Sequence, residues 1–408
     1  MRPTRRHPQR TARLAVTTLF FVNGALFAGW VTRVPDIRDR VGAGAAELGL
    51  ALLGVAVGSL LTMPVAGWAC ARWGGRWIAV GGGLAGCAAI PLPALAHDVP
   101  QLACALMVVG AAFGMLDVAM NVEAIAVERA YRRPIMPSFH GWFSTGGLAG
   151  ALAGGGIASA AVATGPHLGA TGVVGAAAVA WASRHLRPAG EVEPSATPMR
   201  AGERARPREV AGTRGAARTL GTPVLLICGL IAFCAAVGEG AMADWSALYL
   251  TDTLDAGAGI AAMGYAAFAG AMAVGRFAGG RAIAAFGPAG TLQLGCGAAA
   301  LALTAGLAAA DRATTIAAFA VAGLGVACVF PVVLSLAGRA EPGRSGPAVA
   351  FVSTIGYTGF LAGPPLIGFV AEQTTLGWGL GVVALLAAVA AALSVALRPE
   401  TYRGSDPL

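Results

Sequence analysis

The 408-residue chain is 56% hydrophobic and only 12% charged, with a mean hydropathy of +0.70. Soluble domains carry about 25% charged residues, so a soluble fold of this length is excluded. The net charge of +8 comes with 28 basic residues, all of them arginine, and because they are spread along the chain they do not indicate nucleic-acid binding. The 60 glycines follow no G-X-Y period, which excludes collagen.

Twelve apolar stretches follow one another along the chain, each close to the roughly 20 residues that cross a hydrocarbon core about 30 Å thick. Six lie at 12–31, 48–71, 77–96, 102–127, 139–162 and 168–186, and six at 223–250, 260–278, 292–310, 314–337, 348–371 and 376–397. Because lipid cannot satisfy backbone amides, we predict a membrane-spanning helix for each stretch.

The arginines predict the orientation of these helices. With a cytoplasmic N-terminus and twelve crossings, all arginines except Arg33, Arg38, Arg40 and Arg312 fall on the inside. Such an excess of cytoplasmic arginine is the usual pattern of membrane proteins. We therefore expect a multi-pass protein of the cytoplasmic (inner) membrane with both termini cytoplasmic.

A polar stretch rich in Pro, Glu and Arg interrupts the apolar pattern between the sixth and seventh spans. It predicts an N-terminal six-helix half at 1–186, a cytoplasmic linker at 187–221 and a C-terminal six-helix half at 222–408. The halves echo each other, because Gly-Ala-Leu precedes Trp30 in the first span and Gly-Ala-Met precedes Trp245 in the seventh. Internal repeats of this kind are typical of transporter folds.

The loop after the second span carries a motif. Its residues 67–76 match the pattern G-x-x-x-D-R-x-G-R-R/K at Gly67, Arg72, Gly74 and Arg76, with Ala71 in place of the Asp. In this respect the chain resembles the major facilitator superfamily, over essentially its whole length. The resemblance implies a twelve-helix bundle of two halves that opens alternately to either side of the membrane.

A weaker copy of the motif follows the eighth span, at Arg276, Arg281 and Phe286-Gly287, with Gly280 near the place of the Asp. The chain therefore lacks both acids of the family's usual charge latch between the halves. We take the matched residues as candidates for a gating loop, and anchoring of the topology by the arginines remains the alternative.

Four acidic residues lie within predicted spans, where ionisable groups are costly and are commonly functional. They are Asp117, Glu239, Asp244 and Glu123. As candidates for a functional role, Asp117 and Glu239 rank first, Asp244 next and Glu123 last. Burial favours the neutral acid, so such groups are candidates for proton coupling. Permanent pairing within the bundle is the alternative, above all for Glu123.

Asp117 and Asn121 are four residues apart and share one helix face. This spacing resembles the fourth helix of the fucose/proton symporter branch of the superfamily, in which the acid takes part in proton coupling. The resemblance implies that role for Asp117. That branch carries an Asp in the outer part of its first helix, whereas the first span here offers Asn23 and no acid, so symport is not simply carried over and a uniporter or a differently coupled carrier remains open.

Five residues are candidates to line a substrate cavity: Asn23, Trp30, Asn121, Trp142 and Tyr357. An amide facing hydrocarbon is costly, which favours a cavity position for Asn23. For His140, at the cytoplasmic end of the fifth span, we expect an interfacial hydrogen bond, with contact to substrate or proton as the alternative.

No phosphate-binding loop, catalytic motif or metal-ligand spacing is present, and the seven cysteines form no CxxC pair. We expect no enzyme activity, cofactor or metal, and cysteines that serve as core thiols. The predicted fold is an all-α membrane bundle, and the predicted function is secondary transport of a small solute, coupled to protons, by a monomer. A sugar-like polar metabolite and export of an apolar compound or drug remain competing substrates, and a membrane scaffold or enzyme is the alternative from another class.

Overall fold

The structure is a computed structural model that describes residues 6–43, 45–186, 223–341 and 344–397. The predicted linker at 187–221 lies outside the described residues. Those residues form helices and no β-strand. This agrees with the all-α membrane fold expected from the sequence.

Eight helical elements make up the N-terminal half. They are α1 (Arg6–Val31), α2 (Val34–Val41), α3 (Ala45–Trp73), α4 (Gly75–Ala89), η1 (Leu92–Leu95), α5 (Val99–Tyr131), α6 (Met136–Ser159) and α7 (Thr164–Ser183). The C-terminal half contains α9 (Pro223–Leu248), η2 (Tyr249–Thr253), α10 (Ala258–Ala309), α11 (Arg312–Val326), α12 (Val329–Ala340), α13 (Ser345–Gln373), α14 (Leu376–Ser394) and η3 (Val395–Leu397).

Nine helical stretches among the described residues are long and apolar enough to cross a membrane. One of them, Met263–Ala309, contains two crossings, because 47 residues of helix extend about 70 Å and the chain turns back at Gly287 (φ 72°). The glycine-rich helices α6 and α7 supply the remaining two. Together these helices form the predicted twelve-helix bundle of two halves.

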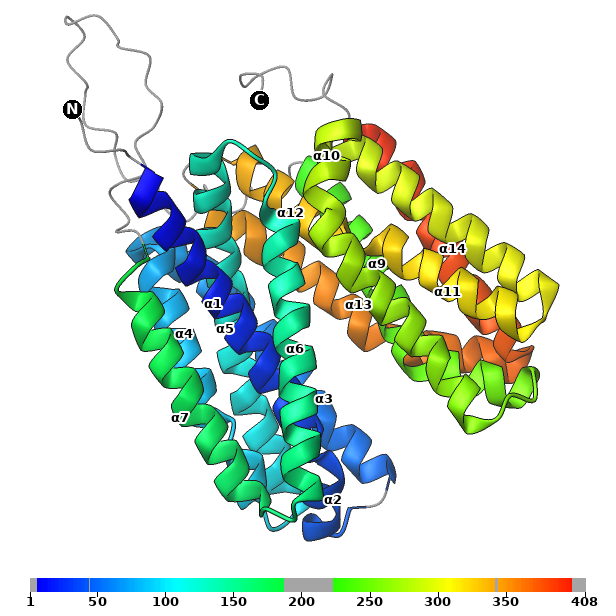
Figure 1. The fold of residues 1–408 in the computed structure, drawn as a ribbon, viewed down its shortest axis with the longest axis horizontal. Coiled ribbons are helices and arrows are strands. Elements are labelled where there is room, and N and C mark those ends of the chain that lie inside the picture. Colours follow the sequence, from blue (N-terminus) through cyan, green and yellow to red (C-terminus); the bar gives the residue numbers. More distant parts are fainter. Residues whose placement is uncertain (1–5, 44, 187–222, 342–343, 398–408) are drawn as a thin grey trace, which may run out of the picture.

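The two halves lie side by side and diverge along their length (Figure 1). They are closest at the end of the bundle where α1 begins, called the near end here, and they separate toward the far end, where α2 lies. Within the N-terminal half, α1 and α6 pack backbone to backbone. A Cβ at Gly24 would come within 2.1 Å of the Phe143 carbonyl oxygen, so only glycine permits this approach.

The contacts between the halves at the near end also depend on glycine. Gly67 of α3 faces Gly346 and Ala350 of α13, where an added Cβ would lie 2.4 Å from the Ala350 side chain. On the other side of the interface, Gly141 of α6 packs against Phe277 of α10. The small residues therefore close the near end of the bundle.

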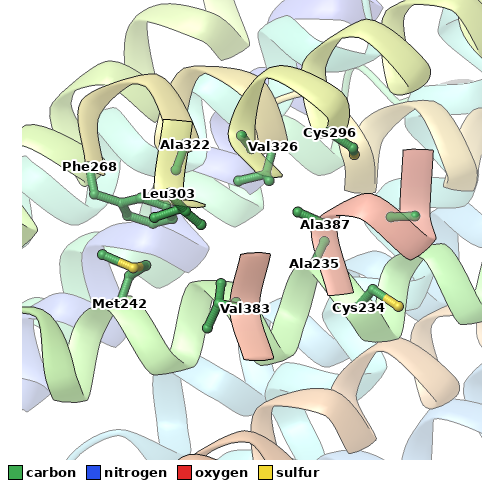
Figure 2. A pocket seen from close by; sticks show the side chains of 13 residues that line it. Cys234, Ala235, Met242, Phe268, Cys296, Leu303, Ala322, Val326, Val383 and Ala387 are labelled. Atoms are coloured by element: carbon green, nitrogen blue, oxygen red, sulfur yellow. The ribbon is translucent and has the colours of Figure 1, made fainter. Parts of the chain in front are cut away.

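The interior of the C-terminal half is apolar and holds a small void of about 20 Å³ (Figure 2). Side chains of α9, α10, α11 and α14 surround it, among them Met242, Phe268, Ala322 and Val383. A void of this size and lining is too apolar to hold ordered water. It is a packing defect of the C-terminal half and lies apart from the charged residues described next.

Candidate functional site

Three polar side chains of the N-terminal half form a continuous line near the middle of the bundle. Asn121 donates through Nδ2 to the backbone carbonyl of Asp117, at 2.8 Å, and the same nitrogen lies 3.4 Å from the Asp117 carboxylate. The Asn121 oxygen lies 3.2 Å from Nε2 of His140. Because that oxygen can only accept, Nε2 of the imidazole carries the hydrogen.

This line begins on α5 and ends on α6. Asp117 lies near the middle of the long helix α5, and the i, i+4 spacing places Asn121 directly beside it, as the sequence predicted. His140 reaches Asn121 from the first turns of α6 and packs its ring against Phe20 at 5.2 Å. For His140 we expected an interfacial hydrogen bond, with contact to substrate or proton as the alternative, and in the structure its hydrogen-bond partner is Asn121.

A second polar group connects the two halves. Arg276 of α10 donates to the hydroxyl of Ser144 on α6 at 2.5 Å, and its guanidinium lies 3.6 Å from the carboxylate of Glu239 on α9. The Arg276 side chain is 11% exposed and that of Glu239 is 27% exposed. The ion pair is therefore partly buried, and its arginine reaches across to the N-terminal half.

The two polar groups are neighbours through α6. Ser144 follows His140 by four residues, on the same helix face, and its hydroxyl lies 3.3 Å from the His140 carbonyl oxygen. Tyr357 of α13, another predicted cavity residue, packs edge-on against Phe360 with 6.0 Å between the ring centroids. We call this set, from Asp117 through His140 and Arg276 to Glu239, the central polar line.

Asn23 lies beside the central polar line, on α1. Its Nδ2 points to the sulfur of Met120 at 3.8 Å, and its Oδ1 is buried without a hydrogen-bond partner. A buried, unpaired amide oxygen is costly unless a ligand or water satisfies it. This position fits the predicted cavity role better than a lipid-facing one.

Three other sequence candidates lie apart from the central polar line. Asp244 is exposed on α9. Glu123 is buried and lies against Gly75, inside the N-terminal half. Trp30 is buried with an indole N–H that has no partner.

Trp142, the last of the predicted cavity residues, has its own setting. It packs edge-on against Phe277 of the other half at 6.1 Å. It also lines a groove on the flank of the N-terminal half.

The motif residues have distinct positions. Gly74 has φ 87°, which only glycine adopts readily, and it makes the turn between α3 and α4. Arg76 donates to the Ser183 carbonyl oxygen at 2.9 Å, within its own half, while Arg72 and Arg281 are exposed at the near end. The predicted eighth span ended at residue 278, and this end was placed too early: the helix continues to Phe286, so Arg281 lies within it rather than in a loop, and Arg276 points into the bundle.

A charged contact that the sequence did not predict closes the near end. The Glu128 carboxylate of α5 is 2% exposed and pairs with Arg339 of α12, at 2.5 Å. The same carboxylate accepts from the Ser335 hydroxyl at 2.5 Å and from the Met136 backbone N–H at 2.7 Å. Arg129 donates to the Gly338 carbonyl oxygen across the same interface.

We call Glu128, Arg129, Ser335 and Arg339 the near-end latch. The family's loop acids are missing at Ala71 and Gly280, and here a carboxylate one helix away carries the negative charge instead. The Glu128-Arg129 pair at the end of the fourth span was the signal available in the sequence. Its partners could not be read from it, because they lie some 210 residues further along the chain.

The comparisons with known proteins agree with this architecture. The family model described as Major Facilitator Superfamily matches residues 15–315. The chain belongs to that superfamily. It is accordingly a secondary transporter of small molecules and not an enzyme, as the sequence led us to expect.

Relatives of similar length support the assignment. An MFS-type transporter of Yersinia pestis is 34% identical over 389 residues, covering 94% of this chain and 95% of the relative. Membrane protein MosC of Rhizobium meliloti is 32% identical over 393 residues, covering 96% and 91%. Both alignments run across the two halves of the bundle.

Solved structures show the same fold. The transporter FucP in the outward conformation superposes with a TM-score of 0.77 at 15% identity, covering 96% of this chain and 98% of FucP. A bacterial homologue of the iron transporter ferroportin in an outward-facing state gives 0.70 at 16% identity, covering 94% and 98%. Among the described residues of this chain, no cluster of three or more His, Cys, Asp or Glu side chains is placed to hold a metal ion.

Proposed function

We propose that the protein moves a small polar solute across the cytoplasmic membrane by alternating access, coupled to protons, and that it works as a monomer. The near end is the cytoplasmic end in this proposal, because the arginines concentrate in the loops on that side. The observation that carries the proposal is the central polar line, which joins two acids on different halves through His140, Ser144 and Arg276.

Proton coupling requires an acid whose protonation alters the contacts between the halves. Asp117 lies at one end of the central polar line, hydrogen-bonded to Asn121, and Glu239 lies at the other, against Arg276. Protonation of Glu239 removes the negative partner of Arg276, the residue that bridges to Ser144. A proton on Glu239 therefore weakens one side of a contact that holds the two halves together.

The near-end latch supports alternating access. It joins α5 to α12 by an ion pair whose carboxylate is buried and whose guanidinium is partly exposed, and the halves diverge from it toward the far end (Figure 1). This arrangement corresponds to a state closed at the cytoplasmic side. Transport then requires Glu128 and Arg339 to separate while the far end closes.

The chemistry of the line favours a polar substrate. Carboxylates, an amide, an imidazole and a guanidinium offer hydrogen-bond donors and acceptors suited to hydroxyl groups. The fold similarity to the fucose:proton symporter FucP is in keeping with a sugar-like solute. Export of an apolar compound is the weaker candidate, because such a substrate would leave these polar groups unpaired.

The decisive experiment measures solute accumulation in proteoliposomes under an imposed pH gradient, with a panel of sugars, polyols and hydrophobic cations. We expect accumulation of a polar solute that collapses when the gradient is removed. Asp117→Asn and Glu239→Gln should abolish accumulation, whereas Asp252→Asn, a matched change of an exposed acid beyond α9, should not. Undiminished accumulation in the Asp117→Asn, Glu239→Gln double variant would refute proton coupling.

A further inference from the structure

We propose that the groove between α1, α6 and α7 binds one acyl chain of a phospholipid from the far-end leaflet, with the lipid ester beside His167 and the chain end against Trp142. The groove has a volume of about 720 Å³ and lies on the flank of the N-terminal half. It is separate from the central polar line.

The groove exists because its two walls share a floor. Helices α6 and α7 both pack on α1 but scarcely contact each other (Figure 1). Small residues of α1 form the floor of the groove and leave space above it. At Gly29, for example, an added Cβ would still be 3.9 Å from the nearest atom, the Thr171 methyl group. An open channel therefore runs along α1 between the two walls.

The surroundings decide what fills this channel. The protein spans the membrane, and groove residues such as Val174, which is 70% exposed, present apolar side chains outward. Two of the hydroxyls in the walls are already used by their own helices, since Thr171 donates to the His167 carbonyl oxygen at 2.9 Å and Thr18 to that of Leu14 at 2.9 Å. Such walls do not hold water, and hydrocarbon is the occupant that the bilayer supplies.

The length of the groove matches one leaflet. On α1 it extends from Gly29 to Thr17, which is about 18 Å at 1.5 Å per residue. The hydrocarbon core of a bilayer is about 30 Å thick, so one leaflet is about 15 Å deep. A single chain that enters at the far end fills the groove from end to end.

The far end of the groove offers one hydrogen-bond donor. His167 lines the groove and is 4% exposed, and its Nδ1 accepts from Arg33 Nε at 3.0 Å. The remaining ring nitrogen, Nε2, must then carry the hydrogen. Arg33 itself is occupied by Asp36 and the Val162 carbonyl oxygen, each at 2.7 Å. The site therefore presents a neutral donor, which suits an ester carbonyl rather than a phosphate.

The other end of the groove touches the contact between the halves. Trp142 lines the groove, lies 6.4 Å from Phe21 of α1 and meets Phe277 of α10 at 6.1 Å, all between ring centroids. A chain end packed on Trp142 holds that indole against Phe277. The lipid thus favours the arrangement in which the near end is closed.

The proposal is tested with a phosphatidylcholine that carries a photoactivatable diazirine at the end of one acyl chain. The full-length protein is reconstituted in nanodiscs, irradiated and analysed by peptide mass spectrometry. We expect labelling at Trp142 and Phe21 at least several-fold above that at Leu152 and Val173, two exposed residues outside the groove. Uniform labelling of all exposed residues would overturn the proposal.

Two blocking variants and a matched control sharpen the test. Ala170→Phe and Ala153→Phe fill the groove from opposite walls, and each should lower the labelling of Trp142 several-fold. Ala180→Phe places the same ring at an exposed position of α7 outside the groove and should leave it unchanged. The specific site is contradicted if labelling of Trp142 falls equally in all three variants, or if it falls in none of them.

The donor at His167 is tested with an ether-linked probe, which lacks the ester carbonyl. We expect it to label Trp142 several-fold less than the ester-linked probe, and equal labelling would overturn the role of His167. Absence of label together with a dimer in the nanodisc would show that a second copy covers the groove, which also overturns the proposal.

Discussion

The two halves share one topology but use it differently. In the N-terminal half, partly buried polar side chains contact one another along α5 and across to α6, from Asp117 through Asn121 to His140. In the C-terminal half, the interior is apolar down to a void of about 20 Å³, and Glu239 and Arg276 pair at the face that meets the other half. A repeated fold therefore does not imply a repeated site.

The helix caps make this comparison direct. Asp98 caps α5 by accepting from the Gln101 N–H at 2.8 Å, and Asp311 caps α11 in the same way through the N–H groups of Ala313 and Thr314. Asp117 lies 19 residues after Asp98, and the residue 19 positions after Asp311 is Phe330. Phe330 stacks on Phe360, with 6.3 Å between the ring centroids. The local start of the helix is retained while the central residue changes from an acid to an aromatic ring.

The largest effect is expected at the near-end latch, to which the N-terminal half gives the acid and the C-terminal half the base. Arg339→Ala leaves the buried Glu128 carboxylate without its counterion, which costs about 3–5 kcal/mol in such pairs. The closed near end should open, and Cys70, buried there beside Gly346, should react faster with a maleimide.

Arg133→Ala is the matched control for the latch, because Arg133 is exposed in the loop between α5 and α6 at the same end. Its Cys70 labelling should equal that of the unaltered protein. The latch is disproved if Arg339→Ala and Arg133→Ala label at the same rate.

A smaller effect is expected where Arg276 bridges the halves. Ser144→Ala removes the acceptor of a hydrogen bond from a charged group, and such bonds contribute about 1.5–3 kcal/mol. Thr145→Ala is the control, since Thr145 bonds only within its own helix, to the Gly141 carbonyl oxygen at 3.0 Å. Thermal unfolding in detergent should show a larger loss for Ser144→Ala, and equal losses would mean that the bridge contributes nothing.

Filling the void of the C-terminal half should have a modest effect in the opposite direction. Val383→Ile adds one methylene group to the lining, and burial of such a group contributes at most about 0.8 kcal/mol. Val389→Ile on the same helix adds the group at a position that is 39% exposed and should be neutral. A lower melting temperature for Val383→Ile would mean that the walls are too rigid to accept it.

The smallest effect concerns the cap of α11 and depends on pH. Hydrogen bonds from the Thr314 side chain and backbone, and from the Ala313 N–H, hold the pKa of Asp311 below its usual value. Because the pKa of Asp311 is lower in the folded state than in the unfolded state, this stabilisation is present above the ordinary aspartate pKa. It is lost as the pH falls from there through the lowered pKa of the folded state.

Hydrogen exchange of the first turn of α11, corrected for intrinsic rates, measures the cap. Protection should fall at acid pH in the unaltered protein. Asp311→Asn keeps a capping oxygen without a titrating group, so its protection should not change with pH. A fall of the same size in that variant would assign the effect to another group.

Much of the fold could be predicted from the sequence because each helix carries its own evidence. Twelve apolar stretches and the turn glycines Gly74 and Gly287 are local patterns, and the structure has them where they were expected, whereas the predicted linker between the halves lies outside the described residues. The spacing of Asp117 and Asn121 likewise placed both on one helix face. The end of the eighth span was placed too early because hydropathy falls at Arg281 whether the helix ends there or continues with that side chain exposed.

What the sequence determined by itself was therefore the membrane, the twelve crossings and the acids that a bilayer makes costly. Only the tertiary structure decided which of those acids have partners: Asp117 and Glu239 belong to one polar line, Glu123 and Asp244 do not, and Glu128, which no motif marked, joins the halves through Arg339. The reason is physical. Burial is fixed by hydropathy along one helix, whereas pairing is fixed by which helices meet, and their partners lie from 19 residues away (Asn121 and His140) to 211 residues away (Glu128 and Arg339) along the chain.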